Sequence, residues 1–253
     1  MVLSALAPRV RRWGRRLAAV AFPPSCVHCG GLVEPAETPA GFRHLCPPCQ
    51  AAVVWVRPPH CSVCGHPFHG IVVGDRECPR CVGLIPAYGE ARTASLFSGP
   101  VRALVIGLKY HHGLHLLADC AALFRGAPQL LDHVRGARLV PVPLHPRKRR
   151  ERGYNQSALL ASELAREAGG ETTVDSLLTR RIDTETQTAF DRERRRANLQ
   201  NAFALAPGAP LRSSARYVLV DDVFTTGSTV NACARVLREA GVKRVDVATL
   251  AHG

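Results

Sequence analysis

Eight of the ten cysteines in this 253-residue chain stand in four C-x-x-C pairs within its first third. Two thiolates separated by two residues can turn toward one metal ion, and a tetrahedral zinc ion needs two such pairs. The pattern therefore predicts two structural zinc sites with four cysteine ligands each and no position left for water. The predicted ligands are Cys26, Cys29, Cys46, Cys49, Cys61, Cys64, Cys78 and Cys81.

The spacing of the pairs favours sharing of each ion by sequential pairs, with 16 residues between the first two and 13 between the second two. Interleaved sharing, first pair with third and second with fourth, stays open on spacing alone. Redox dithiols and disulfides are the alternatives to zinc. His66 and His69 are alternative ligands, although eight thiolates already satisfy two ions. Cys120 and Cys233 lie in apolar helical patterns, which predicts buried small side chains.

The charge of the chain is strongly basic, with 33 Lys and Arg against 20 Asp and Glu and a formal net charge of +13. Such a charge favours polyanionic partners, namely nucleic acid, phosphorylated metabolites or anionic lipid. Apolar residues make up 46% of the chain, enough for a sizeable core. No apolar run reaches the roughly 18–20 residues of a membrane span. We therefore expect a soluble, cytoplasmic protein without a membrane span.

Three parts are expected along the chain. Residues 1–24 combine five arginines with an apolar stripe at helical spacing, which predicts a basic amphipathic helix that docks on the body. A membrane-surface or nucleic-acid-binding helix and a cleaved targeting sequence are the alternatives. Residues 25–86 form the cysteine-rich module, and residues 87–253 form a domain in which strand and helix patterns alternate.

The third part has the pattern of a parallel α/β sheet. Strands are expected over residues 91–97, 138–143, 217–220 and 244–250, and helices over 101–111, 114–124, 154–168 and 228–240. Strand, crossover helix, strand is the unit of such a sheet, and its ligands bind beyond the carboxyl ends of the strands. Loops are expected from Asp222 onward and over residues 143–152.

The segment from Asp221 to Thr229, D-D-V-F-T-T-G-S-T, predicts a phosphate site. Gly227 permits a tight turn, and the hydroxyl and backbone N–H groups around it can converge at the positive end of the following helix. Asp221 and Asp222 would repel a phosphate, so we expect them to accept hydrogen bonds from two neighbouring sugar hydroxyls. A phosphate beside a vicinal diol describes a ribose 5-phosphate, and ordinary helix capping is the alternative. Neither a P-loop motif nor a G-x-G-x-x-G motif is present.

Residues Val218 to Thr229 resemble the PRPP-binding motif of type I phosphoribosyltransferases, PRPP being 5-phosphoribosyl 1-pyrophosphate. From Cys26 to the C-terminus, the order of the motifs resembles the competence protein F (ComF/ComFC) family. After the cysteine pairs these motifs are Leu108-Lys109-Tyr110, Val140 to Pro146, Arg152 to Gln156, Gln187 with Arg192, Arg195, Asn198 and Phe203, and the PRPP loop. The resemblance implies a type I phosphoribosyltransferase-like parallel sheet with flanking helices, preceded by a double zinc ribbon.

The resemblance also implies roles for individual residues. The acidic pair would bind the ribose hydroxyls, and Mg²⁺ would bridge those hydroxyls and the pyrophosphate. The implied PRPP-binding residues are Asp221, Asp222, Thr225, Thr226, Gly227, Ser228 and Thr229. Candidates for a pyrophosphate loop over residues 143–152 and a hood over residues 187–198 are Lys109, Arg147, Arg152, Arg192 and Arg195. For each of these cations, a solvated surface charge is the alternative.

Two functions are compatible with these residues. The first is a Mg²⁺-dependent phosphoribosyltransferase that moves the ribosyl 5-phosphate of PRPP to an unidentified acceptor, with no general acid or base evident. The second is a non-enzymatic competence factor that binds single-stranded DNA and whose loop senses a nucleotide or is a relic. The resemblance implies a link to DNA uptake, with single-stranded DNA and competence helicase machinery as partners. Thr225 stands where enzymes for 6-oxopurines carry Asp, which argues against purine salvage.

Overall fold

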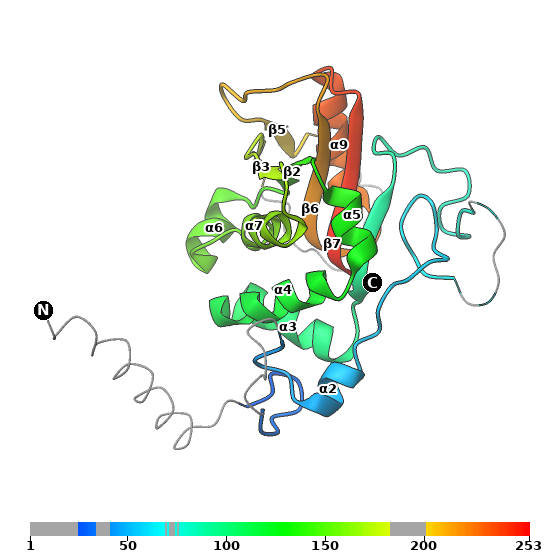
Figure 1. Cartoon of the computed structure of the whole chain (residues 1–253). Helices are drawn as coiled ribbons and strands as arrows, with labels where there is room; N and C mark the ends of the chain where they lie inside the picture. The colour runs from blue at the N-terminus through cyan, green and yellow to red at the C-terminus, as the bar shows by residue number, and fades with distance from the viewer. Residues whose placement is uncertain (1–24, 34–40, 69, 71–73, 75, 183–200) are drawn as a thin grey trace, which may run out of the picture.

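The computed structural model describes residues 25–33, 41–68, 70, 74, 76–182 and 201–253 (Figure 1). Three sequence expectations lie outside the described residues: the basic helix over 1–24, the hood over 187–198 with Arg192 and Arg195, and the alternative ligand His69. The described residues include all eight paired cysteines and most of the expected third part.

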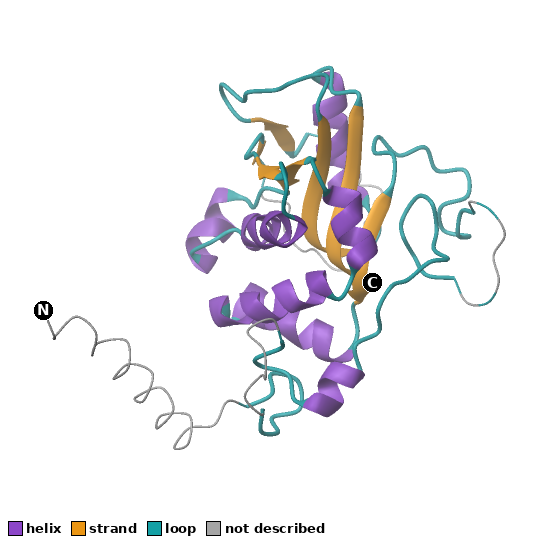
Figure 2. Ribbon diagram, viewed as in Figure 1, coloured by secondary structure: helices purple, strands orange, loops and turns teal. Residues whose placement is uncertain are grey.

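A five-stranded parallel sheet forms the centre of the molecule (Figures 1 and 2). Its strands are β1 (Ala91–Leu96), β2 (Arg138–Pro141), β3 (Thr173–Val174), β6 (Arg216–Phe224) and β7 (Arg244–His252), in the order β1-β7-β6-β2-β3. A separate antiparallel pair joins β4 (Leu178–Arg180) to β5 (Phe203–Leu205). The parallel sheet with its helices confirms the predicted fold class.

Helices cover both faces of the parallel sheet (Figure 2). They are α3 (Gly99–Tyr110), the 3₁₀ turn η1 (Leu114–Leu116), α4 (Leu117–Arg125), α5 (Pro128–Val134), α6 (Pro146–Arg152), α7 (Gln156–Ala168) and α9 (Ser228–Glu239). Successive residues of a strand point to opposite faces, so β6 contributes to two cores. Val218 and Val220 pack with α3, α4, α5 and α7, whereas Tyr217 and Leu219 pack with α9.

The two halves of the cysteine-rich module pack into different cores, one on each face of the sheet. The first ribbon, residues 25–56, includes the short helix α2 (Pro47–Ala51) and packs against α3 and α4. The second ribbon, residues 57–86, packs in the cluster that contains the α9 side chains. Hydrophobic packing is therefore continuous across the boundary that the sequence suggested near residue 86.

Asp119 of α4 holds the first ribbon against the sheet domain. Its fully buried carboxylate accepts hydrogen bonds from the backbone N–H groups of Arg43 and His44, at 2.9 Å each, and pairs with His44 Nδ1 at 2.8 Å. Near the end of the ribbon, the Trp55 ring lies so close to Gly126 that a Cβ atom there would approach it to 2.1 Å. A buried carboxylate is tolerated because these donors satisfy it.

Two segments expected as loops are not loops. β6 continues through Asp221 and Asp222 to Phe224, because its pairing with β7 extends to His252. Residues 146–152 form helix α6, with Pro146 near its start, where the missing N–H has no cost. The sequence patterns did not predict α2, α5 or the short strands β3, β4 and β5.

We predict that Asp119→Ala destabilises the zinc-loaded protein by about 3 kcal/mol, because it removes a buried carboxylate and leaves the backbone N–H groups of Arg43 and His44 without an acceptor. Urea unfolding followed by circular dichroism measures this loss. Asp132→Ala is the matched control, since the Asp132 side chain is 66% exposed and its pair with Arg135 lies on the surface. Equal stability of the two variants would contradict the role of Asp119.

Candidate functional site

The candidate site lies at the carboxyl end of β6, where an open parallel sheet binds its ligands. β6 ends at Phe224, and α9 begins at Ser228. The last residue of β6 is bonded to the residue that follows β7, since the Gly253 N–H donates to the Phe224 carbonyl at 2.8 Å. We call residues 225–229 the cradle.

The cradle presents the start of α9 to an open hollow. Gly227 is the N-cap of α9 with a φ of 71° and offers no side-chain cap, and of the first N–H groups of the helix only that of Ser228 meets a described side chain, Thr226 Oγ1 at 3.4 Å. A Cβ atom at Gly227 would lie 2.7 Å from Phe224 Cζ, so glycine is required by both conformation and space. The hydroxyls of Thr226 and Ser228 hydrogen-bond at 2.9 Å. Uncapped N–H groups beside hydroxyls suit a phosphate.

The structure places the two predicted acids differently. Asp221 lines the hollow of about 30 Å³ that the cradle encloses, and its carboxylate accepts a hydrogen bond from Ser157 Oγ at 2.9 Å. Asp222 is only 4% exposed and pairs with Lys109 Nζ at 2.7 Å and with Gln156 Nε2 at 2.9 Å. Asp221 is therefore available to a ligand in the cradle, whereas Asp222 is bound to α3 and α7.

The environment of Asp221 changes its acidity. Burial is the main cause, and together with the adjacent charge of Asp222 it raises the pKa of Asp221 to about 7. The positive charge of Lys109 and the hydrogen bond from Ser157 act in the opposite direction. At neutral pH the carboxyl of Asp221 therefore lies near its midpoint of ionisation.

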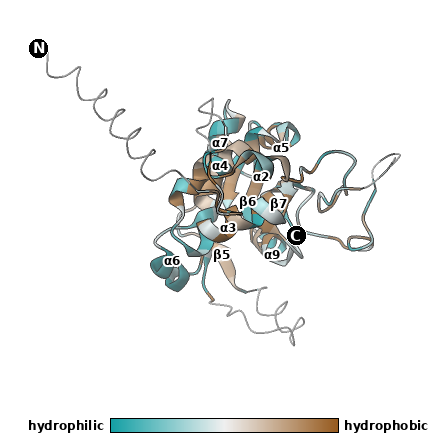
Figure 3. Ribbon diagram, turned by 90° about the horizontal axis from the view of Figure 1, so that it is seen from below, coloured by the Kyte–Doolittle hydropathy of each residue, from teal (hydrophilic) through white to brown (hydrophobic). Residues whose placement is uncertain are grey.

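A second hollow of about 300 Å³ lies beyond Lys109, and we call it the cationic hollow. It is lined by Lys109, Tyr110, His112, Lys148, Glu151 and Arg152. The Arg152 guanidinium lies 5.6 Å from the centre of the Tyr110 ring and donates to Gln156 Oε1. This last contact connects the hollow to Asp222, which Gln156 also contacts. Helix α6, which supplies Lys148 and Arg152, is hydrophilic along its length (Figure 3).

Not all of the predicted cations gather here. Lys109 and Arg152 line the cationic hollow, whereas Arg147 is exposed and pairs with Glu151 at 3.0 Å. Sequence reasoning assigned no role to Gln156 or Ser157, which the structure places against the two acids. A sequence signal could have indicated them, because both residues follow Asn155, a typical N-cap residue, at the start of a predicted helix, and the Asn155 side chain does cap that helix.

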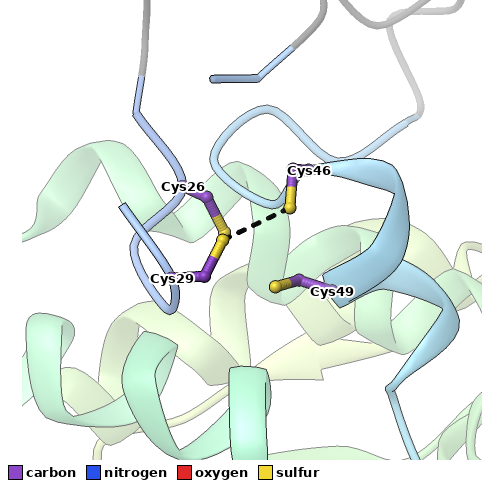
Figure 4. Close-up of side chains that lie close together, drawn as sticks. All are labelled: Cys26, Cys29, Cys46 and Cys49. Carbon is purple, nitrogen blue, oxygen red and sulfur yellow. Dashed lines mark hydrogen bonds between the residues drawn. The ribbon is translucent and has the colours of Figure 1, made fainter. Parts of the chain in front are cut away.

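Two groups of four cysteines have the arrangement of metal sites. Cys26, Cys29, Cys46 and Cys49 form one group (Figure 4), and Cys61, Cys64, Cys78 and Cys81 form the other, with the sulfurs of each group within 4.8 Å of one another. The structure therefore groups sequential pairs, as the spacing favoured. Gly30 and Gly65 follow their knuckles with φ of 74° and 73°, in the left-handed region that favours glycine.

The sulfur geometry fits zinc. Cys29 Sγ lies 3.5 Å from Cys46 Sγ, and Cys64 Sγ lies 3.7 Å from Cys78 Sγ. A tetrahedral ion with bonds of about 2.3 Å sets its sulfurs about 3.8 Å apart. A disulfide requires an S–S distance of about 2.05 Å, and the described cysteines are all free thiols. Four thiolates per group complete the shell of a structural zinc ion.

The second ribbon contacts the cradle through aromatic rings. His66, close to Cys64, lies edge-on to His252 with 5.0 Å between ring centres, and His252 stacks on Phe224 at 5.3 Å. Tyr88 meets the other side of Phe224 edge-on, with 6.4 Å between ring centres. Phe224 is the residue that confines Gly227, so the second ribbon supports the turn that forms the cradle.

Among the described residues, no helix is both long enough and apolar enough to cross a membrane.

We predict that the protein purifies with two zinc ions per chain and that Cys29→Ser lowers the content to about one, because one ligand group is broken. Inductively coupled plasma mass spectrometry measures this. Cys120→Ser is the control and should keep both ions, since Cys120 lies in the core outside both groups. Full zinc content in Cys29→Ser would contradict the ligand assignment.

We predict that Asp221→Asn removes a pH dependence of stability. The folded protein holds a proton on Asp221 up to about pH 7, whereas the unfolded chain releases it at a lower pH, so the stability of the wild type falls as the pH rises between these values. Between about pH 5 and about pH 8, the free energy of unfolding of the variant should rise by about 2–3 kcal/mol relative to that of the wild type. A difference that does not change with pH, measured by urea unfolding, would refute the raised pKa.

Two family models match separate stretches of the chain. Residues 17–82 match the family model described as a double zinc ribbon domain, and residues 155–253 match the phosphoribosyl transferase domain. The second match contains Gln156, both acids and the cradle.

Curated relatives match most of the chain. Competence protein F of Haemophilus influenzae is 30% identical over 231 residues, which cover 90% of this chain and 96% of the relative. DNA utilization protein YhgH of Salmonella typhimurium is 33% identical over 86% of this chain and 95% of the relative. A hypoxanthine phosphoribosyltransferase structure from Staphylococcus aureus is 16% identical with a TM-score of 0.35, covering 54% of this chain and 64% of that one, too distant to indicate a substrate.

Proposed function

The chain belongs to the competence protein F family, and from its site we propose that it binds PRPP as a phosphoribosyltransferase-type protein of DNA utilization. One observation carries the proposal: a cradle with an available carboxylate lies at the carboxyl end of β6, and the ion pair of Lys109 with Asp222 connects this end of the strand to a cationic hollow. These three features match the 5-phosphate, the ribose hydroxyls and the pyrophosphate of PRPP, in that order.

The cradle binds the 5-phosphate. The first N–H groups of α9 and the hydroxyls of Thr226 and Ser228 donate to the phosphate oxygens, and the helix dipole favours their negative charge. Gly227 lets the backbone approach closely because it carries no Cβ atom. Thr225 and Thr229 line the same hollow and complete its set of hydroxyl groups.

Asp221 accepts a hydrogen bond from a ribose hydroxyl when it is ionised. Its existing partner Ser157 keeps the carboxylate oriented toward the hollow. Asp222 does not contact the ligand itself. Its ion pair holds Lys109 in place, and Lys109 lines the cationic hollow. A carboxylate that is 4% exposed keeps this partner because loss of the pair would leave a buried, uncompensated charge.

The cationic hollow binds the pyrophosphate. Lys109, Lys148 and Arg152 bring three cations to its wall, against the single carboxylate of Glu151. The planar guanidinium of Arg152 contacts the Tyr110 ring and Gln156. These contacts orient the guanidinium, which suits it to bidentate contact with phosphate oxygens. These cations stabilise the negative charge that develops on the leaving group.

The residues fit Mg²⁺ as a companion of the ligand. Asp221 offers a carboxylate oxygen beside the hollow, and hard oxygen ligands with substrate phosphates are what Mg²⁺ prefers. When bound, the ion supplies charge neutralisation between the carboxylate and the pyrophosphate. Zn²⁺ belongs to the two cysteine groups, which have a structural role because cysteines fill all four positions.

In the transfer that we propose, the bond from the anomeric carbon to the pyrophosphate oxygen breaks, and the electron pair leaves with the pyrophosphate. A new bond forms between that carbon and a nucleophilic atom of the acceptor, which loses its proton to solvent. Because Asp221 is assigned to the ribose hydroxyl, the proposal gives no described side chain the role of general base and takes the acceptor to be nucleophilic in its own right. The relatives named for competence and DNA utilization favour an acceptor from nucleic acid metabolism.

A second candidate function is binding of single-stranded DNA without turnover. It is favoured by the net charge of +13 and by the cations of α6 beside the site. In that function PRPP or a nucleotide occupies the cradle as a signal, and the competence helicase machinery is the partner that receives the strand.

We predict that PRPP with Mg²⁺ binds the wild type at about pH 8, and that Asp221→Asn weakens binding by roughly 10- to 100-fold, as loss of a hydrogen bond to a charged group does. Isothermal titration calorimetry measures the affinity. Asp132→Asn, on the exposed end of α5, is the control and should bind like the wild type.

The titration tests the binding site, and a separate assay of pyrophosphate release tests the reaction. Unchanged affinity in Asp221→Asn would refute the assignment of the site. Release of pyrophosphate, assayed with bases, nucleotides and oligonucleotides as acceptors, separates a transferase from a protein that only senses PRPP.

A further inference from the structure

A second cavity adjoins the cradle and belongs to no part of the site described so far. This outer cavity has a volume of about 390 Å³, within the range of about 300–1,000 Å³ usual for small-molecule sites. It shares Thr226, Gly227 and Ser228 with the cradle hollow, but Asp221 does not line it. A phosphate in the cradle therefore borders the ribose position on one side and the outer cavity on another.

The floor of the outer cavity is one face of α9. Ser228, Asn231, Ala232 and Arg235 line it and recur at steps of three and four residues, so they lie along one side of the helix. Ala232 is small and leaves room above the helix, whereas its neighbours along the floor carry polar groups. This floor begins at the cradle and leads away from it.

The wall of the outer cavity is the linker that leaves the second ribbon. Leu84, Ile85, Pro86 and Tyr88 line it, and the Ile85 side chain is 96% exposed. Asn231 Oδ1 accepts a hydrogen bond from the Ala87 N–H at 2.7 Å, which fixes the wall to the floor. A rigid apolar wall that remains exposed to water gains free energy when a flat apolar group covers it.

Arg235 stands at the far end of the floor. Its side chain is exposed, and it has no hydrogen bond or ion pair with any described residue. It follows Ser228 by seven positions in the helix, which corresponds to a distance of about 10 Å along the axis. No acidic residue is among the described residues that line the outer cavity. Arg235 is therefore placed to receive a second anion beyond the cradle.

We propose that the cradle and the outer cavity together bind the 3′ end of a single-stranded nucleic acid. The phosphodiester between the last two nucleotides occupies the cradle, and the last sugar lies at Asp221. The penultimate nucleoside lies in the outer cavity with its base against Leu84 and Ile85, and its own 5′-phosphate meets Arg235. The proposal rests on the proposed function, because it uses the same phosphate cradle.

The carboxylate of Asp221, beside the cradle, favours the end of a strand over the interior of a continuing strand. An ionised Asp221 accepts a hydrogen bond from a free 3′-hydroxyl, but it repels a 3′-phosphate or the next phosphodiester of a continuing chain. The strand end and PRPP use the same cradle, so they compete. Two anion positions and an apolar wall between them match a nucleotide unit better than they match a free phosphate.

The test uses the full-length, zinc-loaded protein and a short oligothymidylate labelled at its 5′ end, with binding followed by fluorescence anisotropy. We expect a strand with a 3′-hydroxyl to bind at least 10-fold more tightly than one with a 3′-phosphate, and we expect PRPP to displace it. Arg235→Glu should weaken strand binding at least 10-fold while changing PRPP affinity less than about 2-fold.

Lys243→Glu is the matched control, because it makes the same charge change at an exposed position beyond the end of α9 and outside the cavity lining. It should weaken strand binding less than about 3-fold. Equal losses in the two variants, equal binding of the two strand ends, or PRPP that binds the protein without displacing the strand would each overturn the proposal. Arg235-dependent binding of the 3′-hydroxyl strand without any PRPP binding would refute the proposed function and retain this inference.

Discussion

The buried carboxylate of Asp222 joins the three elements from which the site is built. It extends from β6 to Lys109 at the end of α3 and to Gln156 at the start of α7. Removal of a charge from water is costly unless a partner compensates it, so this pair determines where α3 and α7 can lie. It also links Lys109, which lines the cationic hollow, to the residue that follows Asp221, although Lys109 and Asp222 are more than a hundred residues apart in sequence.

The zinc ribbons are part of this construction. The first ribbon packs into the core beneath α3 and α4, and the second packs beside α9 and reaches the cradle through His66, His252 and Phe224. The linker that leaves the second ribbon forms the wall of the outer cavity. Zinc binding therefore contributes to the shape of the site without chemistry at the metal, because a four-cysteine site leaves no open position.

The features that the sequence predicted correctly are those that depend on residues close together in the chain. The four C-x-x-C pairs and Gly227 in its run of hydroxyl residues indicate zinc knuckles and a tight turn at once. The extension of β6 through Asp221 and Asp222 was missed because acids are depleted in strands, and only pairing with β7 overrides that preference. Helix α6 was missed among its cations, although Pro146 signalled a helix start. The burial of Asp222 by Lys109 depends on tertiary packing, which no local pattern contains.

The central claim is that one ligand spans the cradle and the cationic hollow. Phosphorus-31 NMR of PRPP with Mg²⁺ tests it most directly, because the 5-phosphate and the pyrophosphate have separate resonances. Titration of the zinc-loaded protein should shift or broaden both sets of resonances together and saturate at one ligand per chain. Perturbation of neither group, or of only one of the two, would contradict the claim.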